Sequence, residues 1–229
     1  MLEIVDVHAG YGLTNVLHGV SIAVPDGSVY AVMGHNGAGK TTLLKTVMGL
    51  ISPRRGKIIL DGDDITRTKP HQRVARGMAY VPQGQLSFGQ LSTLENLQVA
   101  ADNRRNGKAK IDEMLDLFPA LRTYAARKAG LLSGGQRQQL SIARALITEP
   151  RLIILDEPTE GIQPSVVAEI EDLIVTLART GLSVLLVEQH VGFALTASAE
   201  YAVMASGHVT SRGSGGRAAV DSVVAAMSI

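Results

Sequence analysis

The sequence predicts an α/β fold in which short buried strands are joined by helices. Apolar strands are expected at 29–33, 152–157 and 183–188. A glycine-rich motif follows the first of these strands and opens a helix. The stretch from about Gly84 to Pro150 has helical patterns, which favours a helical insert in an α/β core.

The glycine-rich motif covers Gly34–Thr42 and fits G-x-x-x-x-G-K-[ST], the phosphate-binding P-loop. Its glycines let the backbone bend around an anion, while successive amides and the helix N-terminus point toward it. Lys40 can reach the β- and γ-phosphates of a nucleotide, and the Thr41 hydroxyl can bind Mg²⁺. The alternative is a glycine-rich turn with a chance Lys-Thr pair. Strand Val29–Met33 before the motif and the helix from Leu43 after it favour the P-loop.

The amino-acid composition argues against several classes of function. The chain has 229 residues, of which 45% are hydrophobic and 19% charged, with a formal net charge of +1 and no cysteine. This balance argues against nucleic-acid binding driven by bulk charge, and the lack of cysteine excludes disulfides and thiol catalysis. The N-terminus does not resemble a signal peptide, and no apolar run reaches the ~18–20 residues that span a bilayer. Work at a membrane would therefore require a partner and the cytoplasmic side.

The N-terminal region is predicted to contain strands that begin at Leu2 and Val20, with Tyr11 in the Gly-Tyr-Gly sequence between them. Tyr11 is either an exposed turn residue or an aromatic platform for a nucleotide base, and the sequence leaves both open. Further along, we expect a strand at 57–60, a short helix at 71–76, and a buried strand at 78–83 that ends on Gln83.

Two capping boxes mark helix starts in the predicted helical insert. Ser92 with Glu95 precedes one helix, and Ser133 with Gln136 precedes another that continues to Leu146. Between them lie a polar connection at 103–108 and an amphipathic helix at 111–117. The Gly134-Gly135 pair is not needed for capping, so exposed amides at this helix start are a second candidate anion site.

The strand at 152–157 ends in Asp156 and Glu157, which is the Walker B pattern. Asp156 would hold Mg²⁺, and Glu157 would polarise the attacking water. A helix at 166–180 and the strand at 183–188, which leads to Gln189 and His190, follow. The remainder predicts a hairpin with its turn at Ser206, a flexible segment over 211–217 and a tail helix from about 218.

These motifs together resemble the ATP-binding subunit of ABC transporters, over essentially the whole chain. The most specific element is Leu-Ser-Gly-Gly-Gln at 132–136. The resemblance implies a P-loop NTPase (RecA-like) core with an antiparallel β subdomain and a helical insert subdomain. It divides a single domain over 1–229 into a core with the β subdomain (about 1–83 and 151–210), a helical subdomain (about 84–150) and a tail (211–229). Within the family, the chain is similar to importer subunits for branched-chain amino acids, amides and urea, and the run 156–165 most resembles the urea type.

The resemblance also implies ATP and Mg²⁺ as cofactors. Tyr11 would stack on adenine, and Gln83 would sense the metal. Three residues of the Leu-Ser-Gly-Gly-Gln signature, Ser133, Gly135 and Gln136, would clamp the γ-phosphate of ATP on an opposite subunit. The expected nucleotide contacts are Tyr11, Val16, Gly34, Asn36, Gly37, Ala38, Gly39, Lys40, Thr41, Thr42, Gln83, Ser133, Gly135 and Gln136. The expected metal ligands are Thr41, Gln83 and Asp156, and the expected catalytic residues are Glu157, Gln189 and His190.

The implied activity is ATP hydrolysis that drives closure and reopening of a dimer. The partners would be a second ATP-binding subunit, identical or different, and membrane permeases that dock on the Gln83–Leu97 region. A periplasmic or extracellular solute-binding protein would act indirectly, and no nucleic acid is expected. The subunit would lie on the cytoplasmic face of the cell membrane as a peripheral protein.

Two positions depart from the family pattern. Many members carry a histidine where this chain has Gln189, and an aspartate where it has Gln163. These departures keep open a regulatory subunit with weak or no turnover, and a further alternative is an ABC ATPase without a transport role. Successive strand residues face opposite sides, so either Gln189 or, with a bulge, His190 reaches the phosphate.

Overall fold

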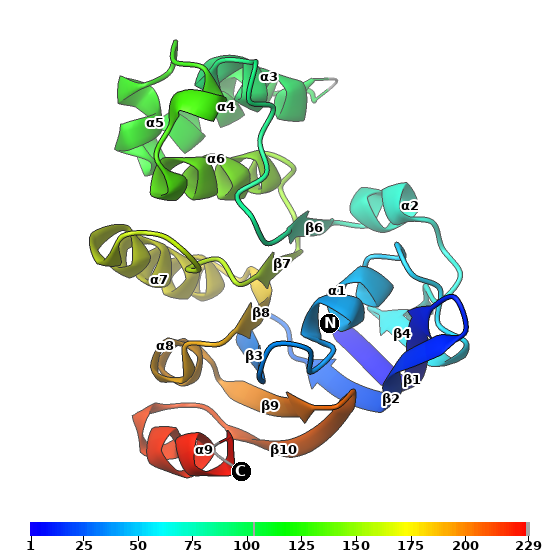
Figure 1. The fold of residues 1–229 in the computed structure, drawn as a ribbon. Helices are drawn as coiled ribbons and strands as arrows, with labels where there is room; N and C mark the ends of the chain where they lie inside the picture. Colours follow the sequence, from blue (N-terminus) through cyan, green and yellow to red (C-terminus); the bar gives the residue numbers. More distant parts are fainter. Residues whose placement is uncertain (103, 228–229) are drawn as a thin grey trace.

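The computed structural model describes residues 1–102 and 104–227, so residues 103, 228 and 229 of the predicted helical insert and tail lie outside the described residues. Two sheets and the helices around them confirm the α/β class (Figure 1). The main sheet has the strand order β10-β9-β3-β8-β7-β6, and only the β10–β9 pairing in it is antiparallel within the described residues. Its strands are β3 (Val29–Met33), β6 (Met78–Val81), β7 (Leu152–Asp156), β8 (Ser183–Glu188), β9 (Glu200–Ala205) and β10 (His208–Ser214).

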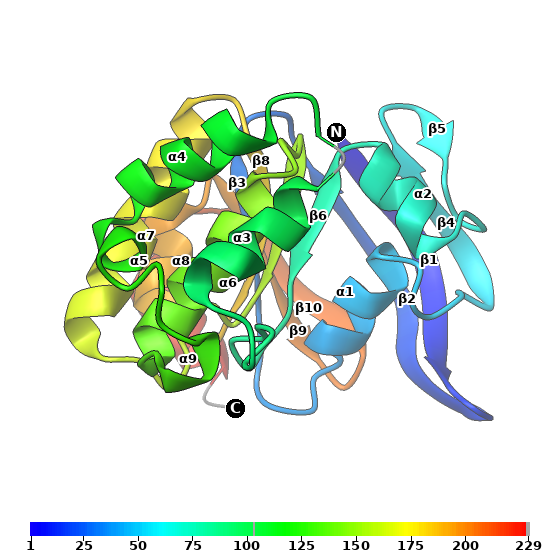
Figure 2. The ribbon, with the colours of Figure 1, turned by 90° about the horizontal axis from the view of Figure 1, so that it is seen from above.

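The second sheet is antiparallel and has the strand order β2-β1-β4-β5. Its strands are β1 (Leu2–Tyr11), β2 (Thr14–Val24), β4 (Arg55–Leu60) and β5 (Asp63–Asp64). The helices are α1 (Lys40–Val47), α2 (Pro70–Ala75), α3 (Thr93–Ala101), α4 (Gly107–Leu117), α5 (Pro119–Thr123), α6 (Gly134–Leu146), α7 (Pro164–Arg179), α8 (Val191–Ala197) and α9 (Val220–Met227). Helices α3–α6 gather at one end of the molecule, whereas β1, β2 and β4 lie beside α1 (Figures 1 and 2).

The central strands are apolar on both faces because both faces are covered. In β7, Leu155 packs in a core cluster with residues of α6 and α7, while Ile154 packs in a second cluster with α1 and the antiparallel sheet. All of β3, β7 and β8 is buried. Continuous apolar runs of this kind are expected for parallel strands that lie between helical layers.

Local signals place the helix starts. Ser92 accepts a hydrogen bond from the Glu95 amide at 3.1 Å, and Ser133 accepts one from the Gln136 amide at 3.3 Å. Both predicted capping boxes are confirmed, since each glutamate or glutamine side chain also accepts from the backbone of its serine. The β9–β10 turn is confirmed as well, with Ser206 in the left-handed region at φ 47°.

The expectation of a flexible segment over 211–217 is wrong for residues 211–214. Strand β10 continues to Ser214 and pairs with β9, with Gly213 opposite Tyr201. A Cβ added at Gly213 would lie 2.9 Å from the Tyr201 hydroxyl, so the glycine allows close packing here. The position of Tyr11 also differs from the expectation, because it is the last residue of β1, paired with Thr14, and not part of a separate turn.

A buried arginine fixes the far end of the P-loop helix. Arg73 of α2 is 1% exposed and donates to the carbonyls of Thr46 and Val47 at the end of α1, at 3.0 and 2.5 Å. Burial lowers the pKa of Arg73 to about 10, which still leaves it charged at neutral pH. A cation at a helix C-terminus satisfies free carbonyls and opposes the helix dipole. Arg73 therefore holds the C-terminal end of α1, the helix that follows the P-loop, against α2.

Candidate functional site

The residues of the site lie at the carboxyl ends of four neighbouring strands. In the order β3, β8, β7 and β6, they end respectively at the P-loop, Gln189, Asp156-Glu157 and Gln83. Because the strands are parallel, their carboxyl ends lie at one edge of the sheet. The predicted P-loop, Walker B and glutamine residues therefore meet, although up to 155 positions separate Gly34 from Gln189 along the chain.

The P-loop itself depends on its glycines. Gly39, at the start of α1, has φ 101°, a conformation that L-residues rarely adopt. A Cβ on Gly34 would lie 2.3 Å from the Met204 carbonyl oxygen. The loop borders a cavity of about 280 Å³ lined by Val16, Asn36, Gly37, Ala38, Gly39, Lys40, Thr41, Thr42, Gln83 and Glu157.

Glu157 is the acceptor on which the polar side chains converge. Its Oε1 lies 3.3 Å from Lys40 Nζ, and its Oε2 accepts from Gln83 at 3.1 Å and from Gln189 at 2.8 Å. Lys40 also donates to the carbonyls of Gly34 and His35. Glu157 is a non-glycine residue at φ 49°, a strained conformation of the kind found at functional sites. The Glu157 carboxylate is thus the anionic partner of the P-loop cation, next to the two carbonyls that also accept from Lys40.

Asp156 precedes Glu157 in the chain and is 1% exposed. Thr41 donates to its Oδ1 at 3.4 Å, and the Tyr80 hydroxyl donates to its Oδ2 at 3.1 Å. Burial, followed by the charge of Asp156, raises the pKa of Tyr80, so the hydroxyl stays protonated and remains a donor. Sequence reasoning missed Tyr80, although the alternation of β6 could have placed it on the face toward α1.

The oxygen donors of Thr41 and Asp156 suit Mg²⁺, which prefers hard oxygen ligands near nucleotide phosphates. Among the described residues, no group of three histidine, cysteine, aspartate or glutamate side chains could hold a metal by itself. This donor set fits a metal that is bound jointly by protein and nucleotide.

The comparisons with known proteins agree with this geometry. The sequence matches the ABC transporter family over residues 17–160, which is more than half of the chain. The chain belongs to the ABC transporter family. It is therefore an ABC ATPase, with an α/β fold of the P-loop NTPase type.

Its relatives carry out different transport tasks. The chain is 41% identical to the probable branched-chain amino acid transport ATP-binding protein LivF of Archaeoglobus fulgidus, covering 93% of this chain and 92% of that protein. It is 35% identical to the lipopolysaccharide export system ATP-binding protein LptB of Escherichia coli K12, covering 86% and 84%. A solved nucleotide-free ATP-binding cassette from an ABC transporter superposes with a TM-score of 0.87 at 26% identity, covering 98% of this chain and 95% of that one.

Two acidic residues of this ABC ATPase escaped sequence reasoning. Glu160 accepts a second hydrogen bond from Gln83, at 2.6 Å. Glu188 is 3% exposed and accepts from the backbone and hydroxyl of Thr159, at 3.2 and 2.8 Å, which ties the Walker B loop to the end of β8. Burial raises the pKa of Glu188. For Glu188, the signal in the sequence was an acidic residue at the end of an apolar strand, which is the same pattern that predicted Asp156.

The signature residues lie outside the P-loop cavity of the same chain. Ser133 and Gln136 cap α6, and Gly135 packs so closely that an added Cβ would lie 2.7 Å from Val166 Cγ1. Tyr11 is also outside the cavity and is 50% exposed. Val16, in contrast, lines the cavity, and its Cγ1 would lie 3.5 Å from a Cβ on Gly39.

At the end of β8, Gln189 and His190 have different surroundings. Gln189 donates to Glu157 at 2.8 Å and to the P-loop Asn36 at 2.9 Å. Both residues line a cavity of about 610 Å³ that is also bordered by Val167 and Glu171 of α7, but of these two side chains only that of Gln189 is hydrogen-bonded to Glu157 and Asn36 among the described residues.

We therefore expect Gln189→Ala to lower steady-state ATP hydrolysis about tenfold, since one hydrogen bond to a charged group contributes about 1.5 kcal/mol. His190→Ala should stay within about twofold of the unmodified protein. Rates are to be measured with the cognate partner present. A loss confined to His190→Ala would contradict this assignment and place the histidine at the phosphate.

Proposed function

We propose that this ABC ATPase is the ATP-hydrolysing motor subunit of an importer for branched-chain amino acids. The observation that carries the proposal is the meeting of Lys40, Gln83 and Gln189 on Glu157 beside the P-loop. The 41% identity to LivF over 93% of the chain supports the importer group. The urea and amide assignments stay predictions from the sequence.

ATP binding would exchange the partners of Lys40. The ammonium, now held by Glu157 and two carbonyls, would turn to the β- and γ-phosphates in the P-loop cavity. Glu157 would then be free to orient and deprotonate the attacking water. Thr41 and Asp156 would hold Mg²⁺, with Gln83 nearby, and the metal would neutralise charge on the phosphates.

Tyr11 would bind the adenine ring, because it is half exposed at the end of β1 and can offer a ring face. Tyr11→Ala should weaken ATP binding by about 1–3 kcal/mol, the range for base–aromatic stacking, and Tyr11→Trp should be tolerated. The measurement is an ATP titration by fluorescence or calorimetry. Leu13→Ala is the matched control in the adjoining loop, where Leu13 is fully exposed. Equal affinities of unmodified protein and Tyr11→Ala would remove Tyr11 from the site.

A second ATP-binding subunit would complete the site. Ser133, Gly135 and Gln136 lie outside their own P-loop cavity, so a partner's nucleotide is the target that they would reach. Amides at the start of α6 suit a phosphate. Both identical and different partners fit this arrangement. Turnover without a partner would therefore be slow.

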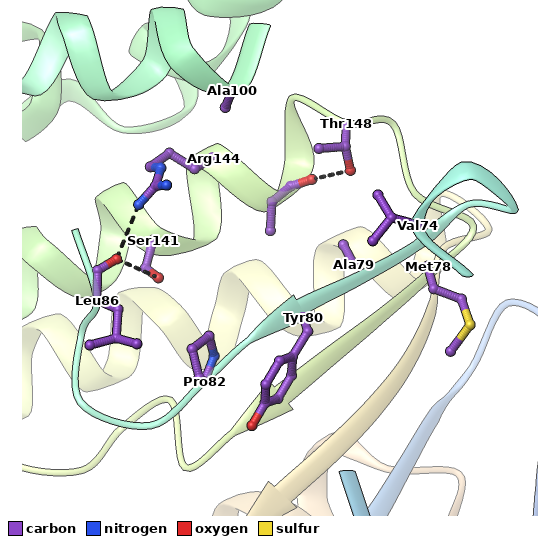
Figure 3. A pocket seen from close by; sticks show the side chains of 11 residues that line it. Val74, Met78, Ala79, Tyr80, Pro82, Leu86, Ala100, Ser141, Arg144 and Thr148 are labelled. Carbon is purple, nitrogen blue, oxygen red and sulfur yellow. Dashed lines mark hydrogen bonds between the residues drawn. The ribbon is translucent and has the colours of Figure 1, made fainter. Parts of the chain in front are cut away.

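Permease subunits would dock near the Gln83–Leu97 region. A cavity of about 350 Å³ opens there between β6 and α6 (Figure 3). Leu86 and Phe88 beside it are 58% and 48% exposed, and the Arg144 guanidinium lies 4.7 Å from the centre of the Phe88 ring. Exposed apolar side chains around a hollow suit a helix of a membrane partner. Among the described residues, no helix is long and apolar enough to cross a bilayer. The permease would hold the subunit at the cytoplasmic face of the membrane.

The alternative with the most support is a regulatory subunit that binds ATP with little turnover, because Gln189 cannot carry a proton charge. Similarity to LptB keeps export as another alternative. A role with nucleic acid has no support in the net charge of +1.

Reconstitution tests the proposal. The subunit would be assembled in vesicles with its cognate permeases and solute-binding protein, and both the ATPase rate and the uptake of solute would be measured. Leucine, isoleucine or valine should stimulate both, and urea and small amides serve as competing solutes. ATP hydrolysis without uptake of any amino acid, urea or amide would overturn the importer assignment. Uptake of urea alone would replace the branched-chain assignment.

A further inference from the structure

The orientation of the Asp156 carboxylate is set from both sides. Thr41 donates to Oδ1 and Tyr80 to Oδ2, and the aspartate is 1% exposed, so water does not take the place of either donor easily. A carboxylate with one ordered donor on each oxygen has little freedom to rotate. Thr41 and Asp156 are also the proposed metal ligands, whereas Tyr80 contacts only the oxygen turned away from Thr41.

The fold brings Tyr80 to Asp156. In the parallel pair β6–β7, Tyr80 is in register with Ile154, so Asp156 lies two residues farther along β7. Two strand residues span about 6.6 Å, which the long tyrosine side chain can cover. Tyr80 packs in the same core cluster as Ile154 and α1, while the adjacent Ala79 packs in the opposite cluster. Figure 3 shows the Tyr80 ring on the other side of β6 from Arg144 and Ala100.

The chemistry of the donor matters. A lysine or arginine beside Asp156 would neutralise the carboxylate and compete with a bound cation. A phenol orients the carboxylate by a hydrogen bond and leaves its charge available to the metal. Partners that orient a metal ligand in this way typically contribute 10–100-fold to metal affinity.

We propose that Tyr80 is a positioning residue that holds Asp156 in the orientation needed to bind the metal of Mg·ATP, an inference that rests on the proposed function. Tyr80 would act through Asp156 and would touch neither nucleotide nor metal. Tyr80 would thus add a residue of β6, one of the edge strands of the main sheet, to the P-loop and Walker B residues that form the site.

The test is Tyr80→Phe, which removes only the hydroxyl. Mn²⁺ is titrated into the protein in the presence of ADP, and free Mn²⁺ is followed by electron paramagnetic resonance. We expect the Mn²⁺ concentration at half saturation to rise about tenfold. ADP affinity in the presence of a chelator and the metal-free melting temperature should stay close to those of the unmodified protein. Tyr30→Phe is the matched control, because Tyr30 is a buried tyrosine of β3 in the same core cluster.

The outcomes separate this inference from the function on which it rests. Asp156→Asn should abolish most Mn²⁺ binding, and unchanged binding in that variant would overturn Asp156 as the metal ligand. If Asp156→Asn loses the metal but Tyr80→Phe binds Mn²⁺ as the unmodified protein does, only the role of Tyr80 is wrong. Should Tyr80→Phe fold poorly, Tyr80→Met, which also lacks a donor, replaces it under the same criteria.

Discussion

Glu157→Gln is expected to lower ATP hydrolysis by about 10²–10⁴-fold while ATP binding is kept, because an amide cannot accept the proton of the attacking water. The carboxylate is the common acceptor of Lys40, Gln83 and Gln189. The substitution keeps the shape and removes the negative charge that holds Lys40. ATP affinity should therefore be equal or slightly higher.

The measurement is single-turnover hydrolysis, together with size-exclusion chromatography in Mg·ATP. The variant should accumulate as a dimer or as a complex with its partner subunit, because the closed state is not reopened by hydrolysis. Glu160→Gln is a comparison variant, since Glu160 also accepts from Gln83 but is not paired with Lys40. It should reduce the rate much less. Unchanged turnover in Glu157→Gln would eliminate Glu157 as the catalytic carboxylate.

Lys40→Ala is expected to reduce ATP affinity by about 100-fold or more. Hydrogen bonds to charged groups contribute about 1.5–3 kcal/mol each, and Lys40 is placed to reach two phosphates. In addition, Glu157, which is 7% exposed, would lose the ammonium at 3.3 Å and repel the γ-phosphate. Both effects act against the nucleotide.

An equilibrium titration with Mg·ATP measures this change. Lys45→Ala is the matched control, because Lys45 lies in the last turn of the same helix, away from the P-loop. Its ATP affinity should be unchanged. Retention of affinity within a few-fold in Lys40→Ala would contradict the assignment of the P-loop as the nucleotide site.

The sequence by itself determined the features that depend on neighbouring residues. Continuous apolar runs predicted the buried strands β3, β7 and β8 because parallel strands are covered on both faces. The capping boxes at Ser92 and Ser133 were predictable because their hydrogen bonds span three residues. The P-loop motif predicted Lys40 and Thr41 because its spacing fixes both side chains on one helix start.

Only the tertiary structure decided how these parts meet. The order β3-β8-β7-β6 places Gln189 and Gln83 on Glu157, and no local pattern specifies which strands become neighbours. The strand character of 211–214 comes from pairing with β9, which outweighs a glycine- and serine-rich composition. The contact of Tyr80 with Asp156 likewise depends on the register between β6 and β7. Strand pairing, register and contacts between side chains of different strands are long-range properties. The motifs in the sequence therefore predicted several residues of the site but not the contacts between them.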